Sequence, residues 1–224
     1  MQQSNSIDFV NREGIHQTLE LPVYPKVVSA LDHKMRNGAD ATTISNLIKK
    51  DPAISQMVLK IINSPLFCLP NKITSIEHAV LLSGADRIKL LVLTPNLKSA
   101  LLMQTDVSDF LWRRSIMNAL CASKLTTIVD DIDHDDAYMA GMFQNSGSMI
   151  LHKHYDDYET VFTHACEQAK PVYVEEFEHY GISNIAIANS FAKKWTLPDV
   201  VSSTMLNQNE IDYANIENRD VRGL

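Results

Sequence analysis

A short polar run interrupts one of the most apolar stretches of the chain. Residues 141–151 read GMFQNSGSMIL, so Gln144, Asn145 and Ser146 stand between apolar residues on both sides. Buried amides and hydroxyls cost free energy unless hydrogen bonds satisfy them. The run could therefore serve a reaction, a ligand or a hydrogen-bonded join between helices. Its serines do not form the G-x-S-x-G pattern that presents a hydrolase nucleophile.

The histidines and glycines exclude several familiar kinds of site. None of the eight histidines shows the His-x-x-x-His spacing of a zinc site, and no cysteines are closely paired. His152 and His154 are two residues apart, so they diverge on a helix. A metal site built from His152, His154 and Asp156 is the remaining route to hydrolytic chemistry. The seven glycines are scattered, which excludes a glycine-rich phosphate-binding loop.

Helices are the elements expected to position these residues, because apolar side chains recur at helical spacing almost throughout. Thr42 or Thr43 is expected to cap one helix, and Asp51-Pro52 to start the next. Pro95 predicts a kink or a break, and a strong helix is expected from Asp109. No segment is typical of a strand. The expected fold class is therefore all-α.

Composition favours a folded, cytoplasmic protein without a membrane segment. Hydrophobic residues make up 45% of the chain and charged residues 21%, and no apolar run approaches the roughly 20 residues of a membrane helix. Cys68, Cys121 and Cys166 are interpreted as reduced core thiols. Residues 1–105 carry eleven basic and eight acidic residues, and residues 106–224 carry nine and nineteen. The first half is far from the dense basic stripe of a nucleic-acid-binding protein.

Six stretches, taken in order, resemble the HD-related output domain (HDOD) of bacterial signalling proteins. They are LPVYPKVV, DATTISNLIKKDPAISQMVLKIINSPLF, KITSIEHAVLLSGADRIKLLVL, LWRRSIMNALCASKL, AYMAGMFQNSGSMIL and FAKKWTLP. The resemblance implies two packed helical bundles. The expected division is an N-terminal helical subdomain over 1–105, a degenerate HD-like helical subdomain over 106–208 and a polar tail over 209–224. The whole chain would form one HDOD unit.

The resemblance also identifies positions at which related HD-domain phosphohydrolases hold a metal ion. In this chain those positions are Arg114, Gln144, Asn145 and Asn184. Hydrolytic metal sites use carboxylates and imidazoles, whereas amides offer neutral oxygens and Arg114 would repel a cation. The sequence therefore predicts no metal, no other cofactor and no catalytic residue.

Three functions remain as hypotheses. The first is a non-catalytic signal-transduction domain that acts through other signalling proteins, with a candidate interaction loop at Asn63, Ser64, Phe67 and Leu69. The second is a sensor of a nucleotide or another small anion, using Arg114 with the amides of the former metal cavity. The third is a residual phosphohydrolase. Because one domain can serve many outputs, the partner cannot be named from the resemblance.

Overall fold

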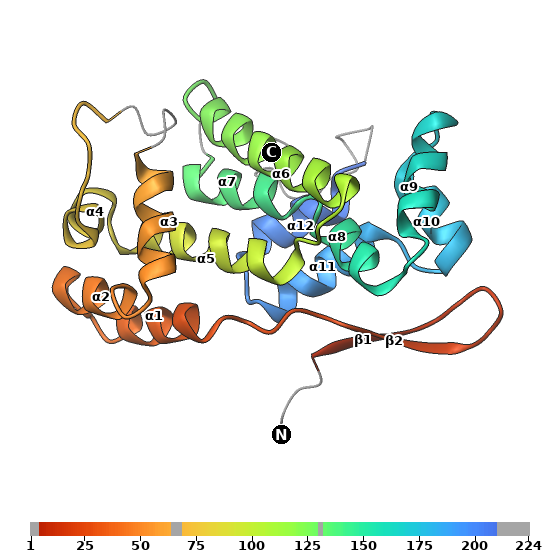
Figure 1. Ribbon diagram of the computed structural model, residues 1–224, viewed down its shortest axis with the longest axis horizontal. Helices are drawn as coiled ribbons and strands as arrows, with labels where there is room; N and C mark the ends of the chain where they lie inside the picture. Colours follow the sequence, from red (N-terminus) through yellow and green to blue (C-terminus); the bar gives the residue numbers. More distant parts are fainter. Residues whose placement is uncertain (1–4, 64–68, 130–131, 210–224) are drawn as a thin grey trace. The chain divides into compact units, whose positions relative to one another are not determined.

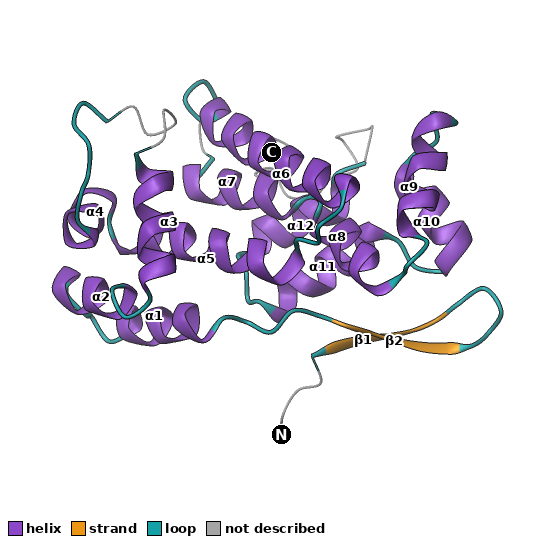
Figure 2. Ribbon diagram, viewed as in Figure 1, coloured by secondary structure: helices purple, strands orange, loops and turns teal. Residues whose placement is uncertain are grey.

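The computed structural model describes residues 5–63, 69–129 and 132–209. Within these ranges helices carry most of the chain, and one short hairpin accompanies them (Figure 2). The all-α expectation is thus confirmed. The chain divides into two compact units, one formed by Met1–Val23 with Leu101–Leu224 and the other by Tyr24–Ala100. This division differs from the expected one, because residues 1–23 group with the second half.

In its described residues the unit Tyr24–Ala100 contains five helices. They are α1 (Lys26–Arg36), α2 (Ala41–Ile48), α3 (Pro52–Ile62), α4 (Ile76–Ser83) and α5 (Ala85–Leu101). Leu101, the last residue of α5, belongs to the other unit. Side chains cap the starts of three of these helices, α2, α3 and α4. Asp40, and not Thr42 or Thr43, caps α2 by accepting a hydrogen bond from the Thr43 amide at 2.8 Å. Asp51 caps α3 as expected. Pro95 lies inside α5 without ending it.

The hairpin is the main departure from the predicted elements. Strands β1 (Ser6–Val10) and β2 (His16–Glu20) pair antiparallel, with Ser6 opposite Glu20 and Val10 opposite His16. Gly14 adopts a φ of +77° in the turn, a conformation that glycine reaches without strain. Leu19 is buried, and the Tyr155 hydroxyl donates to Gln17 Oε1 at 2.7 Å. These contacts attach the hairpin to the helices of its own unit.

Seven helices complete the unit that holds the polar run. They are α6 (Asp106–Leu125), α7 (His134–Phe143), α8 (Ser146–His154), α9 (Tyr158–Glu167), α10 (Val172–Tyr180), α11 (Asn184–Lys194) and α12 (Asp199–Asn207). Helix α6 begins three residues before the expected Asp109, because Thr105 caps it by accepting from the Ser108 amide. The residues directly after the expected subdomain boundary at 105 and 106 therefore form the first turn of a helix.

Two close helix contacts bring the polar run to the centre of this unit. Helices α6 and α7 lie side by side (Figure 1). A Cβ added at Gly141 would lie 2.5 Å from the Ala119 backbone nitrogen, so only glycine permits this approach. Helices α8 and α11 also pack together, and a Cβ at Gly147 would lie 1.9 Å from the Asn184 carbonyl oxygen. The run thus lies between α6 on one side and α11 on the other.

Two remaining expectations concern the membrane and the cysteines. No helix in the described ranges has the length and apolar character needed to cross a membrane. Cys121 and Cys166 are exposed, so their assignment to the core is wrong. Each occupies a helix face that points away from the buried stripe of its own helix. Cys68 and the expected tail beyond residue 209 lie outside the described residues.

Candidate functional site

The polar run forms the junction of α7 and α8 and meets polar positions of α6. Gln144 follows the last residue of α7, and Asn145 precedes the first residue of α8. The side-chain amide of Asn118 donates through Nδ2 to Gln144 Oε1. Asn145 is 8% exposed, and its Nδ2 donates to Ser115 Oγ at 3.1 Å. Both amides of the run are therefore hydrogen-bonded within the unit.

Arg114 is not among the hydrogen-bonded residues described at this junction. It is exposed on α6, whereas the next residue, Ser115, is fully buried. Consecutive helical residues point about 100° apart, so Arg114 and Ser115 face different directions. Arg114 lies one turn before Asn118, which contacts Gln144, but no hydrogen bond described within residues 5–63, 69–129 and 132–209 joins Arg114 to Gln144 or Asn145. The anion pocket around Arg114 therefore stays a prediction.

Asn184 belongs to a second polar cluster, at the start of α11. Its Nδ2 donates to Ser148 Oγ at 3.0 Å, and its backbone N–H donates to Glu176 Oε2 at 2.7 Å. The close contact at Gly147 places α8 against this point. The four residues predicted as a remnant pocket therefore separate into an α6 junction, an α11 cluster and one exposed arginine.

A buried carboxylate at the centre of the second cluster was missed by sequence reasoning. Glu176 lies in α10 and is 0% exposed. Its Oε1 accepts from the Tyr158 hydroxyl at 2.6 Å and from Ser148 Oγ at 3.2 Å. Its Oε2 accepts from the backbone N–H of Asn184. The available signal was the i, i+4, i+8 spacing of Val172, Glu176 and Tyr180. An acidic stretch, EEFE, obscures that spacing.

The direction of these hydrogen bonds matters for the charge of Glu176. Ser148 Oγ accepts from Asn184 and so directs its own proton to the carboxylate. None of the hydrogen-bond partners described for Glu176 is a cation. Burial raises the pKa of Glu176 to about 7, although the bonds from Tyr158, Asn184 and Ser148 act to lower it. The group therefore sits between two opposed effects, of which desolvation is the larger.

His152 adds a second buried polar group beside this cluster. It stacks on Tyr158 with ring centroids 5.4 Å apart, and its Nδ1 has no hydrogen-bond partner. Its Nε2 lies 3.6 Å from Glu159 Oε1. Burial lowers the pKa of His152, and the Glu159 carboxylate acts weakly in the opposite direction. The hydroxyl of Ser146 is likewise buried without a partner.

The three residues of the residual-enzyme hypothesis do not converge. His152 is buried, whereas His154 is exposed and lies edge-on to Tyr155, and Asp156 is exposed. Across residues 5–63, 69–129 and 132–209, no three His, Cys, Asp or Glu side chains are placed to hold a metal ion. The polar cluster instead offers amides, hydroxyls and one carboxylate that accept or donate among themselves.

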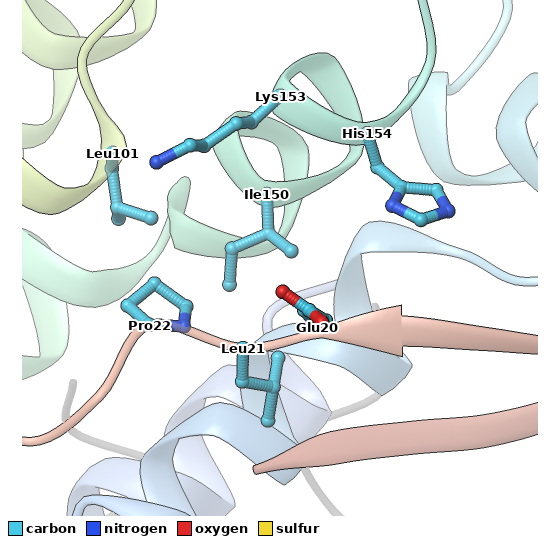
Figure 3. A pocket seen from close by; sticks show the side chains of 7 residues that line it. All are labelled: Glu20, Leu21, Pro22, Leu101, Ile150, Lys153 and His154. Atoms are coloured by element: carbon cyan, nitrogen blue, oxygen red, sulfur yellow. The ribbon is translucent and has the colours of Figure 1, made fainter.

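A separate cavity of about 210 Å³ lies between β2 and α8. Its lining consists of Glu20, Leu21, Pro22, Leu101, Ile150, Lys153 and His154 (Figure 3). None of the four predicted remnant-pocket residues contributes to it, whereas His154, named for the residual-enzyme hypothesis, does. Leu21, Pro22, Leu101 and Ile150 form an apolar lining, and the three charged or titratable side chains stand around it.

The predicted interaction loop is only partly described. Ser64 and Phe67 lie outside the described residues, and Leu69 is half-buried. Asn63 has a structural role, because its Nδ2 donates to the carbonyl oxygens of Leu59 and Ile73 at 2.7 Å. Its Oδ1 accepts from the Ile73 amide at the same distance. The loop remains a prediction as an interaction surface.

The fold and the central junction define an all-helical protein in which the side chains of Gln144, Asn145 and Asn184 are hydrogen-bonded to neighbouring side chains. The HDOD domain model matches residues 21–211. The chain therefore belongs to the HDOD family, as its sequence resemblance implied.

Solved structures support the same fold. An HDOD domain protein of unknown function from Geobacter sulfurreducens is 22% identical, with a TM-score of 0.71 over 86% of this chain and 66% of that chain. A protein from Shewanella amazonensis, provisionally called a phosphohydrolase, is 21% identical, with a TM-score of 0.70 over 85% of this chain and 69% of that one. A Marinobacter aquaeolei protein, provisionally called a signal transduction protein, is 21% identical, with a TM-score of 0.65 over 91% of this chain and 47% of that chain.

These similarities establish the fold and leave the activity open. All three identities lie near one fifth, and one fold can serve different functions. The chain spans 39% of the length of the curated relative that it matches.

Proposed function

We propose that this HDOD chain is a signal-transduction domain that acts through protein partners and does not catalyse metal-dependent hydrolysis. The observation that carries the proposal is the pairing of amides with neighbouring side chains. Gln144 accepts from Asn118, and Asn145 donates to Ser115. Asn184 donates to Ser148 in the second cluster.

These pairs give the unit a stable polar centre without a bound ion. Related hydrolases would need carboxylates and imidazoles at these positions. An amide keeps the size and the hydrogen-bonding capacity of the group it replaces but carries no charge. The side-chain amides of Gln144, Asn145 and Asn184, of which Asn145 is buried, each have a partner within the unit, so hydrogen bonding at these positions is satisfied without a metal. Such a centre favours a role in recognition over one in catalysis.

The hydrolysis of phosphate esters is the direct test. The purified chain would be incubated with nucleotides and cyclic dinucleotides in the presence of Mn²⁺, Mg²⁺ or Fe²⁺. We expect no turnover above that of buffer with metal, and no stoichiometric metal in the purified protein. Turnover that disappears in Gln144→Ala and persists in Lys193→Ala, an exposed control on α11, would refute the proposal.

A further inference from the structure

The outward face of α6 carries apolar side chains that the rest of its unit leaves exposed. Phe110 is 51% exposed, with one side of its ring near Phe162 of α9 at a centroid distance of 6.1 Å, and Met117 is 58% exposed. Ile128 is 78% exposed in the turn that prolongs the helix, where its amide donates to the Leu125 carbonyl. Cys121 is exposed between them. Large apolar residues in one exposed line are typical of an interaction surface.

The spacing of this line matches that of a helix-pairing seam. We define the α6 seam as Phe110, Arg114, Met117, Cys121, Lys124 and Ile128. Its steps alternate between four and three residues, which keeps the five side chains from Phe110 to Lys124 on one face of α6. Ile128 follows in the turn after the helix. Leu111, Ser115 and Ala119 are buried on the opposite face. The seam is therefore separate from the face that packs against α7.

The charges along the seam are of one sign. Residues 110–129 contain Arg113, Arg114 and Lys124 and no acidic residue, and all three basic side chains are exposed. Acidic residues occur on α6 only in its first turn, at Asp106 and Asp109. This is unusual within residues 106–224, where acidic residues outnumber basic ones by nineteen to nine. Arg114 and Lys124 thus interrupt the apolar residues of the seam, and Arg113 lies beside it, within an otherwise acidic half.

We propose that the α6 seam docks an amphipathic helix of a partner protein, with acidic residues beside the partner's apolar stripe. The inference rests on the proposed function and names its surface and its class of partner. Two helices can pair along such a line by knobs-into-holes packing. The positive charges of Arg114 and Lys124 favour a partner helix that carries negative charge.

A second copy of this chain fits the seam poorly. Parallel pairing would place Arg114 opposite Arg114. Antiparallel pairing about the middle of the seam would place Arg114 opposite Lys124. Both arrangements bring like charges together, which disfavours the contact. An anionic membrane is disfavoured by the net charge of the chain, −7.

The test uses synthetic helical peptides and the full chain. One peptide carries leucines at seam spacing with glutamates beside them, and the second carries lysines in place of the glutamates. Binding would be followed by fluorescence anisotropy of the labelled peptide. We expect the glutamate peptide to bind at least about tenfold more tightly than the lysine peptide, and its affinity to fall with added salt.

Charge reversal on the protein locates the binding. Arg114→Glu is expected to weaken the binding of the glutamate peptide by about tenfold or more. Lys193→Glu, the same charge reversal at an exposed residue of α11, should leave the affinity unchanged. Met117→Asp should abolish binding, with tryptophan fluorescence confirming that each variant is folded.

Equal affinity for the two peptides, or no saturation up to about 1 mM, would overturn the proposal. Cosedimentation with phosphatidylglycerol vesicles that Arg114→Glu abolishes would overturn it in favour of a membrane. Dimerisation in analytical ultracentrifugation that Met117→Asp abolishes would overturn it in favour of self-association. Phosphate-ester turnover would instead refute the absence of catalysis and leave the peptide result standing.

Discussion

Replacement of Glu176 by glutamine provides the sharpest test of the buried cluster. Glu176 is fully buried, and its carboxylate accepts three hydrogen bonds from neutral groups. Glutamine has almost the same size and keeps one acceptor oxygen, but it cannot ionise. Comparison of Glu176→Gln with the unaltered protein therefore isolates the contribution of ionisation to stability.

The expected magnitude follows from the pKa of this carboxyl group. Burial raises the pKa of Glu176 from 4.5 to about 7. The folded protein thus binds this proton more tightly than the unfolded chain does. The stabilisation is fully present below the unfolded pKa and is lost as the pH rises through the folded value. Between about pH 5 and about pH 8 the free energy of unfolding should fall by about 2.5 kcal/mol from this group alone.

Urea unfolding followed by tryptophan fluorescence measures this effect in the right unit. The two tryptophans, Trp112 and Trp195, are buried and both belong to the unit that contains Glu176. The stability of Glu176→Gln relative to the unaltered protein should rise by about 2.5 kcal/mol from about pH 5 to about pH 8. Glu178→Gln, in the same helix but exposed, serves as the matched control. His152 titrates in both proteins, so its contribution cancels in the difference.

Two results would contradict this reasoning. A stability difference that does not change with pH would mean that Glu176 has the same proton affinity in the folded and unfolded states. A difference of the opposite slope would mean that the three donated hydrogen bonds outweigh the desolvation of the carboxylate.

Two further predictions concern the close contacts and the junction. Gly147→Ala should destabilise the unit by about 3 kcal/mol or more, because its Cβ would lie 1.9 Å from the Asn184 carbonyl oxygen; an unchanged urea midpoint would show that α8 and α11 can separate freely. Ser115→Ala should cost about 1–2 kcal/mol by leaving Asn145 Nδ2 without its partner. Ser146→Ala should cost almost nothing, since that buried hydroxyl has no partner to lose. The reverse order of the two serine variants would contradict the described hydrogen bonds.

Local sequence signals predicted most helices because their causes lie within a few residues. Asp51-Pro52 starts α3 and Ser75 caps α4 as expected, since a cap needs only a side chain and nearby backbone amides. The same local reasoning failed for the hairpin. Ile7 and Phe9 alternate with more exposed neighbours, but five-residue strands are too short to predict without knowing the surface that buries Leu19. Pro95 does not break α5, and the kink that it also predicts stays a prediction.

The sequence alone indicated the family, the helical class and a polar run within an apolar stretch. It could not determine which α6 residue meets that run, because Arg114 and Ser115 are adjacent in the chain and point about 100° apart on the helix. Only the tertiary structure turned Ser115 inward to Asn145 and left Arg114 on the exposed seam. Glu176 shows the same limit, since a buried carboxylate is recognised by the donors that converge on it from α8, α9 and α11. Those donors are brought together by helix packing, and helix packing depends on residues far apart in the chain.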